Sequence, residues 1–131
     1  AKSCKERDGR IVIFGIGVDV CSVERLKQSL EATPKLGQRL FTEAELKTKP
    51  ESLAARFAAK EALAKALGDP RILSWQEVEV LNSELGKPVL KLTGASAESV
   101  ADLGVKTTHL SLTHDAGLAI AMVVLEGGSD A

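Results

Sequence analysis

Apolar residues occur along the chain in short runs and stripes that predict a mixture of strands and helices. The first run, Ile11 to Val18, is continuous and too short for a helix, so it predicts a buried strand. Two glycines within it, Gly15 and Gly17, predict that another part of the protein approaches the strand backbone closely. Ser22 follows as a helix N-cap, ahead of an apolar stripe at helical spacing formed by Val23, Leu26 and Leu30.

The middle of the chain carries the signals of a long helix. Thr42-Glu43-Ala44-Glu45 has the spacing of a capping box, and Phe41 is placed to pack on Leu46 as a hydrophobic staple. The helix that follows, from Glu51 to Leu67, contains seven alanines and ends at Gly68, a residue suited to the position after a helix C-terminus.

Alternating patterns and turn residues dominate the C-terminal half. The expected elements are a strand over Trp75 to Leu81, a break at Gly86-Lys87-Pro88, a strand over Val89 to Leu92, a helix over Ser96 to Leu103, and strands over Thr107 to Thr113 and Leu118 to Leu125 joined by a turn at Asp115-Ala116-Gly117. The order β-α-α-α-β-β-α-β-β ends in adjacent hairpins. It predicts a compact α+β domain with an antiparallel sheet and packed helices, rather than a doubly wound parallel sheet.

Length and composition narrow the class of protein. The 131 residues suit one domain, which we expect over residues 11–126, with a flexible arm over 1–10 and a flexible tail over 127–131. Three Phe, one Trp and no Tyr predict a core of Ala, Val, Ile and Leu, with the Ala-rich stretches covered by a subunit partner. Cys4 and Cys21 are too few for a disulfide framework and predict free thiols in a cytoplasmic protein.

Charge and hydropathy argue against two kinds of partner. Lys and Arg number 17 against 18 Asp and Glu, so the formal net charge of −1 gives no reason to expect nucleic acid. No apolar run approaches the roughly 18–20 residues needed to cross a bilayer, so no membrane partner is expected. Gly15-Ile16-Gly17 is not a dinucleotide fingerprint either, because Val20 occupies the position of the third glycine.

Several polar residues interrupt apolar segments and are candidates for chemistry. Asp19 ends the first strand, where a carboxylate serves either as a helix-entry residue or as a ligand. At about 100° per residue, Glu61 and Lys65 fall on a helix face that is otherwise made of Phe57 and alanines. They form either an exposed i,i+4 ion pair or part of a site where charge is costly unless it is paired or liganded.

Two histidines complete the set of candidates. His114 stands at the end of a strand on its leucine side, and is either a buried, hydrogen-bonded core residue or part of a site. His109 falls on the polar side of the same strand and is expected to be solvated. Two histidines without paired cysteines make a zinc site improbable. Two carboxylates, a lysine and a histidine instead suit Mg²⁺ and a pyrophosphate, although their spacing alone does not establish such a site.

Four segments of the chain resemble the signature motifs of one family, in the family's order and near its spacing. They are Gly15-Ile16-Gly17-Val18-Asp19-Val20 with Val23-Glu24-Arg25-Leu26, Arg56-Phe57-Ala58-Ala59-Lys60-Glu61-Ala62 with Lys65-Ala66-Leu67-Gly68, Gly86-Lys87-Pro88, and Leu110-Ser111-Leu112-Thr113-His114. The family is that of the holo-acyl-carrier-protein synthases, which are 4′-phosphopantetheinyl transferases. The resemblance covers Ile11 to Glu126.

The resemblance implies an activity and an assembly. Members of the family move 4′-phosphopantetheine from coenzyme A to a serine of an acyl carrier protein and release adenosine 3′,5′-bisphosphate. The carrier serves fatty-acid synthesis, polyketide assembly or both. Short members of the family are compact α+β subunits that form homotrimers, with active sites in the clefts between subunits.

Carried over by position, the resemblance also implies roles for individual residues. Asp19 and Glu61 would coordinate Mg²⁺, with Mn²⁺ as an alternative, and Lys65 would contact the coenzyme A phosphates. The remaining assignments are Arg56 and His114 on the phosphates of the nucleotide end, Gly86, Lys87 and Pro88 at the adenine, and Arg25, with Lys27 as a weaker candidate, on the acidic helix of the carrier. Glu61, directly or through a water, is the first choice of base for the serine proton, and His114 is the second.

One departure from the family pattern and two other functions stay open at this point. Asp115 follows His114 where many relatives have a small hydroxyl residue. The chain could instead be a non-catalytic module that binds a carrier protein or a nucleotide, although the combination of Asp19, Glu61 and Lys65 argues against that. It could also be a Mg²⁺-dependent hydrolase of a nucleotide pyrophosphate.

Overall fold

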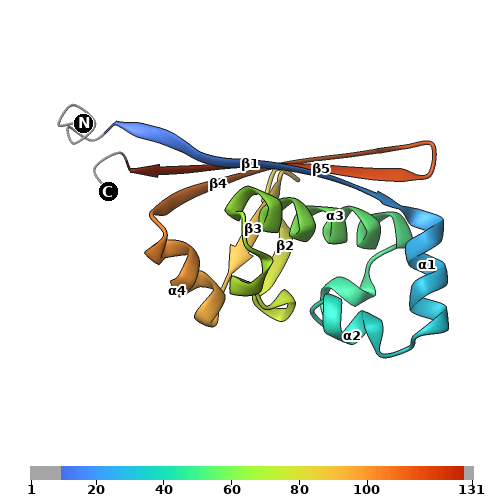
Figure 1. The fold of residues 1–131 in the computed structure, drawn as a ribbon. Helices are drawn as coiled ribbons and strands as arrows, with labels where there is room; N and C mark the ends of the chain where they lie inside the picture. The colour runs from blue at the N-terminus through green and yellow to red at the C-terminus, as the bar shows by residue number, and fades with distance from the viewer. Residues whose placement is uncertain (1–9, 129–131) are drawn as a thin grey trace.

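The computed structural model describes residues 10–128; residues 1–9 of the expected arm over 1–10 and residues 129–131 of the expected tail over 127–131 lie outside the described residues. The elements in chain order are β1 (Ile11–Ser22), α1 (Val23–Ala32), α2 (Leu36–Leu40), α3 (Pro50–Leu67), β2 (Val78–Asn82), β3 (Pro88–Leu92), α4 (Gly94–Asp102), β4 (Val105–Asp115) and β5 (Leu118–Gly128) (Figure 1). Short 3₁₀ turns lie at Glu45–Lys47, Pro70–Ile72 and Trp75–Glu77. The predicted order of helices and strands is confirmed.

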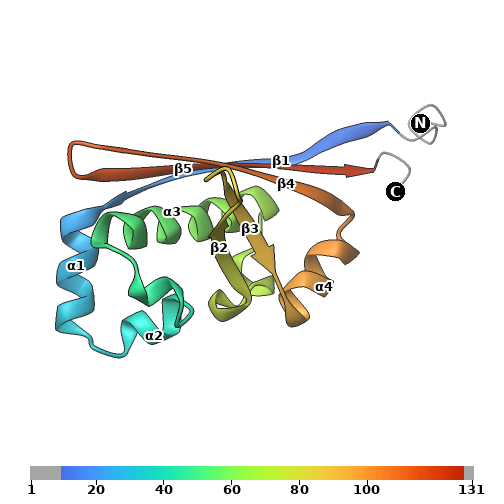
Figure 2. The same cartoon turned by 180° about the vertical axis from the view of Figure 1, so that it is seen from behind.

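Two antiparallel sheets form the β part of the fold. One has the strand order β1-β5-β4, and the other consists of β2 and β3. The helices lie on one side of the three-stranded sheet (Figures 1 and 2). The predicted turn between β4 and β5 is present, and its central residues Ala116 and Gly117 both have positive φ, 52° and 78°. Positive φ at both positions matches the hairpin turn whose twist suits antiparallel strands.

The long helix α3 lies directly against β1 and β5. A Cβ atom added at Gly15 would overlap the carbonyl oxygen of Ala66, and one at Gly17 would overlap that of Ala62. The predicted close approach to this strand is therefore confirmed, and the approaching element is α3. The core between α3 and the sheets consists mainly of Ala58, Ala59, Ala62, Leu63, Val78, Val80, Leu110, Ala121, Val123 and Leu125.

The structure corrects the expectation that the first strand is buried. Only one face of β1 packs against α3; on the other face Ile16, Val18 and Val20 are 55%, 55% and 56% exposed. The strand therefore carries apolar residues on both faces, but the chain itself packs against only one of them. No helix within residues 10–128 is long and apolar enough to cross a membrane.

Three smaller differences concern element boundaries. The capping box forms, since Thr42 N donates to Glu45 Oε1 at 2.9 Å and Glu45 N donates to Thr42 Oγ1 at 3.2 Å. It starts only a 3₁₀ turn, however, and the second helix lies earlier, as α2. Trp75–Glu77 is a 3₁₀ turn rather than strand. Gly127 and Gly128, which we expected in the tail, continue β5.

Candidate active site at the junction of β1 and α3

Asp19 and Lys65 meet where the end of β1 passes α3. Asp19 pairs with buried Ala121 of β5, so its side chain faces the helix side of the sheet. Lys65 Nζ donates to Asp19 Oδ1 at 2.9 Å and to the carbonyl oxygen of Val18 at 3.1 Å. The Asp19 side chain is 18% exposed and that of Lys65 is 59% exposed. A partly buried carboxylate is therefore held by an ammonium that water still reaches.

Glu61 lies one helical turn before Lys65 and joins this pair. Burial raises the pKa of Glu61, the negative charge of Asp19 raises it further, and the ammonium of Lys65 opposes both effects. The same two charges also affect Cys21. Burial raises the pKa of its thiol, and the charges of Asp19 and Glu61 raise it further. The two carboxylates thus lie near enough to repel each other, and the ammonium of Lys65 offsets part of their negative charge.

An open cavity of about 380 Å³ lies beside these residues and is lined by Glu61, Ala64, Lys65, Gly68 and Pro70. Gly68 adopts φ of +86° immediately after α3, as the sequence predicts for a residue at a helix C-terminus. A second hollow, on the side of α1, is lined in part by Cys21, Ser22, Arg25 and Phe57. The acidic pair is therefore accessible from the surface.

The donor set fits a magnesium ion that is shared with a phosphate. Mg²⁺ prefers hard oxygen ligands and is usually held by one or two carboxylates together with substrate phosphates and waters. Asp19 and Glu61 supply two such carboxylates on neighbouring elements. Residues 10–128 hold no group of three or more His, Cys, Asp or Glu side chains able to bind a metal, so the protein alone does not complete a coordination shell here.

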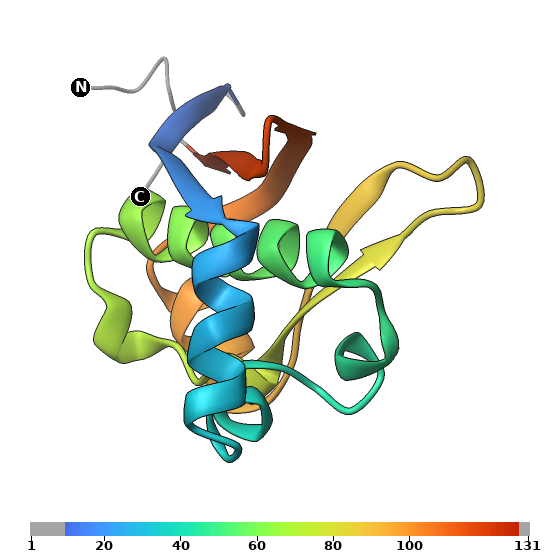
Figure 3. The same cartoon turned by 90° about the vertical axis from the view of Figure 1, so that its right-hand side faces the viewer.

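Other candidate residues lie elsewhere in the chain. His114 is exposed at the end of β4, not buried in the core, and lines a separate hollow with Glu51 and Asp115. Arg56 is half-buried on α3, and its Nε is a buried donor without a hydrogen-bond partner in the described part of the chain. Gly86, Lys87 and Pro88 belong to the β2–β3 hairpin, which projects away from the body in yellow in Figure 3.

Two side chains near the site received no role from the sequence. Cys21 follows Asp19 by two positions on β1, and this alternation alone places both on the same face of the strand. Lys60 is fully buried in α3 and pairs with Glu45. The sequence indicates its burial only through its position on the side of the helix that also carries Leu63 and Leu67.

His109 is exposed as expected, and its Nε2 lies 2.6 Å from Glu126 Oε1.

Comparisons with known proteins show the family of the chain. The family model described as "ACPS: 4'-phosphopantetheinyl transferase superfamily" matches residues 15–123. The holo-[acyl-carrier-protein] synthase of Clavibacter michiganensis subsp. michiganensis is 54% identical over 116 residues, covering 88% of this chain and 98% of the relative. That of Streptomyces coelicolor is 52% identical over 121 residues, covering 88% and 98%.

Solved structures agree with the sequence relatives. Holo-[acyl-carrier-protein] synthase from Neisseria meningitidis superposes with a TM-score of 0.81 at 29% identity, over 87% of this chain and 98% of that one. The Bacillus anthracis enzyme, solved in complex with CoA (3',5'-ADP), gives a TM-score of 0.72 at 34% identity, over 88% and 97%. The chain therefore belongs to the 4′-phosphopantetheinyl transferase superfamily. Within it the similarity is to the holo-[acyl-carrier-protein] synthases, so the resemblance and the α+β fold are both confirmed.

Proposed function

We propose that this enzyme transfers 4′-phosphopantetheine from coenzyme A to a serine of an apo-acyl carrier protein, giving the holo-carrier and adenosine 3′,5′-bisphosphate. The observation that carries the proposal is the contact between Lys65 and Asp19 at the junction of β1 and α3, beside a cavity that both Lys65 and Glu61 line, in a chain matched by the family from residue 15 to residue 123. A relative from Helicobacter pylori, 30% identical with a TM-score of 0.73, was also solved with coenzyme A.

Asp19 and Glu61 are the residues that would hold Mg²⁺, with Mn²⁺ as a substitute. When bound, the cation supplies positive charge against the negative charge that develops on the phosphoryl oxygens. Burial and then the charge of Asp19 raise the pKa of Glu61, and this supports the assignment, because a divalent cation would offset the repulsion between the two carboxylates.

Lys65 and Glu61 have separate tasks in the transfer. The carrier serine attacks the β-phosphorus of coenzyme A in line with the leaving phosphate. The exposed ammonium of Lys65 is free to turn from Asp19 toward the phosphate oxygens and to stabilise them. Glu61, directly or through a water, is our first choice for the base that takes the serine proton, because it is the carboxylate that lines the open cavity. His114 is the second choice.

The separation of the remaining residues supports an active site shared between subunits of a homotrimer. Arg56, His114 and the hairpin with Gly86, Lys87 and Pro88 do not line the cavity beside Glu61. The Nε of Arg56, a buried donor without a hydrogen-bond partner among residues 10–128, suits a phosphate oxygen. A neighbouring copy could bring a second set of these residues to the cavity.

The open face of the three-stranded sheet is where the copies would meet. Its exposed apolar side chains are Ile11, Ile13, Ile16, Val18, Val20, Leu118, Ile120 and Met122. A contiguous apolar patch on a sheet is typical of an interaction surface. Covering it would also account for a first strand that is apolar on both faces.

The carrier protein would approach along α1. Arg25 is exposed on this helix and lines the hollow that also contains Cys21, next to the acidic pair. A positive side chain at this place suits the acidic helix of a carrier, and Lys27, also exposed on α1, is a weaker candidate. Because the relatives are bacterial and the two cysteines suit a reducing compartment, we propose a cytoplasmic location.

The test is to incubate the protein with coenzyme A, Mg²⁺ and an apo-acyl carrier protein and to weigh the carrier by mass spectrometry. A gain of one phosphopantetheine group is expected. Cleavage of coenzyme A without modification of the carrier would favour a hydrolase, and binding without either reaction would favour a non-catalytic module. Glu61→Gln should lose nearly all turnover with an unchanged fold, whereas Glu98→Gln, an exposed glutamate on α4, should be as active as the wild type.

A further inference from the structure

A buried ion pair lies beside α3 on a different side from Glu61. Lys60 Nζ is 2.7 Å from Glu45 Oε1, and the two side chains are 0% and 1% exposed. Nζ also donates to the carbonyl oxygens of Leu40 at 2.8 Å and Trp75 at 3.0 Å. All three hydrogens of the ammonium are therefore used by acceptors from three separate segments of the chain.

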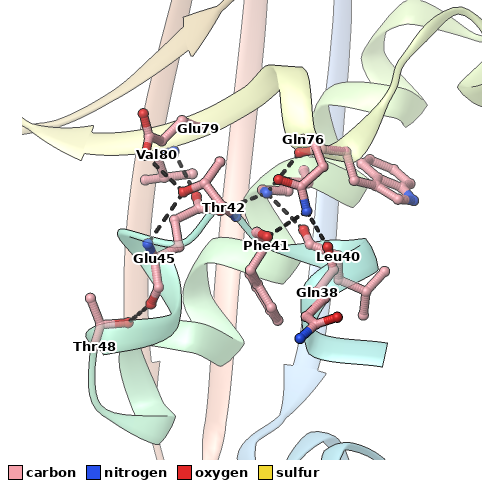
Figure 4. Close-up of polar contacts among 11 residues, drawn as sticks. Gln38, Leu40, Phe41, Thr42, Glu45, Thr48, Gln76, Glu79 and Val80 are labelled. Atoms are coloured by element: carbon pink, nitrogen blue, oxygen red, sulfur yellow. Dashed lines mark hydrogen bonds and ion pairs between the residues drawn. The ribbon is translucent and has the colours of Figure 1, made fainter. Parts of the chain in front are cut away.

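Glu45 extends this network to the neighbouring strand. Its Oε1 also accepts the backbone N–H of Thr42 at 2.9 Å, and its Oε2 accepts that of Val80 at 2.9 Å. Thr42 Oγ1 in turn donates to Glu79 Oε2 at 2.7 Å. Figure 4 shows Glu45 and Thr42 bridging to the strand that carries Glu79 and Val80. The network thus joins α3, the segment after α2 and the start of β2 into one unit.

Stability alone does not account for a lysine in this position. Burial lowers the pKa of Lys60, and the hydrogen bond and charge of Glu45 oppose that shift. A buried salt bridge is commonly no more stabilising than apolar side chains of similar volume, because both ions lose their hydration. Its neighbours along α3, from Ala54 to Leu67, are mostly apolar. The ammonium instead fixes the orientation of α3, because its three acceptors, which lie in fixed positions, allow only one placement of the helix.

The placement of α3 decides where Glu61 lies. On one side the backbone of the helix lies directly against Gly15 and Gly17 of β1. On another side the Lys60 network holds it, with the ammonium also 5.3 Å from the centre of the Phe41 ring. Glu61 follows Lys60 directly, so any rotation of this turn moves its carboxylate relative to Asp19. A misplacement of about 1 Å can cost about a hundredfold in rate.

We propose that Lys60 is a positioning residue, whose buried contacts with Glu45, Leu40 and Trp75 hold α3 in the rotation that brings Glu61 beside Asp19. Lys60 itself touches neither substrate nor metal. The inference rests on the proposed function for the role of Glu61, and it extends the active site to a network inside the core. Removing that network should impair metal use and turnover beyond any loss of stability.

The experiment compares two core variants with a matched control. Lys60→Met keeps the length of the side chain without the charge. Lys60→Met/Glu45→Gln removes both charges, so that no unpaired ion stays buried, and keeps an amide oxygen for Thr42 or Val80. The control is Glu77→Gln, because Glu77 accepts bonds from Ser96 N at 3.0 Å and Ser96 Oγ at 2.7 Å and contributes to the start of α4 instead. Each variant is measured for Tm, kcat, KM for coenzyme A, the half-saturating Mg²⁺ concentration and Mn²⁺ binding by electron paramagnetic resonance.

We expect both core variants to lose about tenfold or more in kcat and to need about tenfold more Mg²⁺, as substitutions behind metal ligands commonly do. The double variant should regain much of the Tm lost by Lys60→Met without regaining kcat. Glu77→Gln should lower Tm and leave kcat and the Mg²⁺ requirement unchanged. Wild-type kcat and Mg²⁺ dependence in the double variant, or the same kcat loss in Glu77→Gln at equal Tm, would overturn the proposal.

A wild-type protein that leaves the carrier unmodified would contradict the proposed function, not this inference. Crystal structures of the wild type and the double variant then decide the positioning role. Displacement of the Glu61 carboxylate relative to Asp19 in the variant supports it, and an unchanged arrangement overturns it.

Discussion

The ammonium of Lys65 and the carboxylate of Asp19 are joined by a 2.9 Å contact between Nζ and Oδ1. The pair spans β1 and α3, and it occupies an oxygen that a divalent cation would also use. In the proposed site, Lys65 and the cation would therefore compete for Asp19 until coenzyme A binds and its phosphates attract the ammonium.

This competition predicts opposite effects of Lys65→Met on two measurements. Without coenzyme A, the variant should bind Mn²⁺ a few-fold more tightly, because a nearby positive charge is gone. The gain is small because the Lys65 side chain is 59% exposed and water screens its charge. Turnover should fall about a hundredfold or more, because the phosphate oxygens lose their ammonium. Titration with Mn²⁺ and steady-state kinetics test both effects. The exposed Lys91→Met serves as control, and weaker Mn²⁺ binding by Lys65→Met would refute the competition.

The raised pKa of Glu61 predicts how stability depends on pH without metal. Burial and the charge of Asp19 raise this pKa above its ordinary value of 4.5, so the folded protein holds the proton more tightly than the unfolded chain does. The contribution of Glu61 to stability is complete below the ordinary pKa and is lost as the pH rises through the raised one. Urea unfolding in EDTA at a series of pH values should show this loss in the wild type.

The difference between wild type and Glu61→Gln isolates this group from the other titrating residues. The variant should lack the decline above pH 4.5 that Glu61 causes, and saturating Mg²⁺ should remove the decline in the wild type. Parallel pH curves for the two proteins would show that the pKa of Glu61 is not raised in the folded protein.

The site shows which contacts a sequence can predict. Glu61 and Lys65 were placed on one helix face because the geometry of a helix fixes residues four apart. The partner of Lys65 was not predictable in this way, since Asp19 lies 46 positions away and reaches it only through the packing of α3 on β1. The bond from Lys60 to Glu45 was missed for the same reason.

The first strand shows a different limit. Its glycines correctly predicted a close neighbour, because a residue without a side chain is needed where another backbone comes into direct contact. Its continuous apolar run predicted burial, yet Ile16 and Val18 are more than half exposed in the single chain. An apolar sequence predicts that a surface is buried, but it does not say whether the same chain or another one buries it.

Gly17→Ala tests the contact between β1 and α3. The new methyl group would overlap the backbone of Ala62, which cannot yield as a flexible side chain would. We expect the free energy of unfolding to fall by about 1–3 kcal/mol, the range typical of overpacked sites. Because the strand must move away from the helix, kcat should fall as well, through displacement of Asp19. Urea unfolding and kinetics check this, and an unchanged unfolding curve would contradict the contact.

Arg25→Glu tests the approach of the carrier protein. Reversing an exposed charge at a docking surface should raise KM for the carrier about tenfold, mainly at low salt, and leave KM for coenzyme A nearly unchanged. Lys35→Glu, an exposed reversal beyond the end of α1, is the matched control. Equal losses for both substrates would show that Arg25 does not distinguish the carrier.

Val18→Lys tests the open face of the sheet as a subunit interface. Val18 is 55% exposed in the single chain, and a lysine buried between copies would be costly without a partner. Light scattering should show a trimer for the wild type and monomers for Val18→Lys. Leu103→Lys, at a residue 46% exposed after α4, should stay trimeric. A monomeric wild type would contradict the assembly.

Mixing two inactive proteins tests whether neighbouring subunits share one active site. Glu61→Gln and His114→Ala each damage every site of their own trimers. If a site takes Glu61 from one subunit and His114 from the next, random co-assembly restores up to about one quarter of the sites in cyclic trimers. Carrier modification should therefore reappear after the two proteins are unfolded and refolded together, but not when each is refolded alone. Failure to recover activity from co-assembled trimers would place Glu61 and His114 of each site in the same chain.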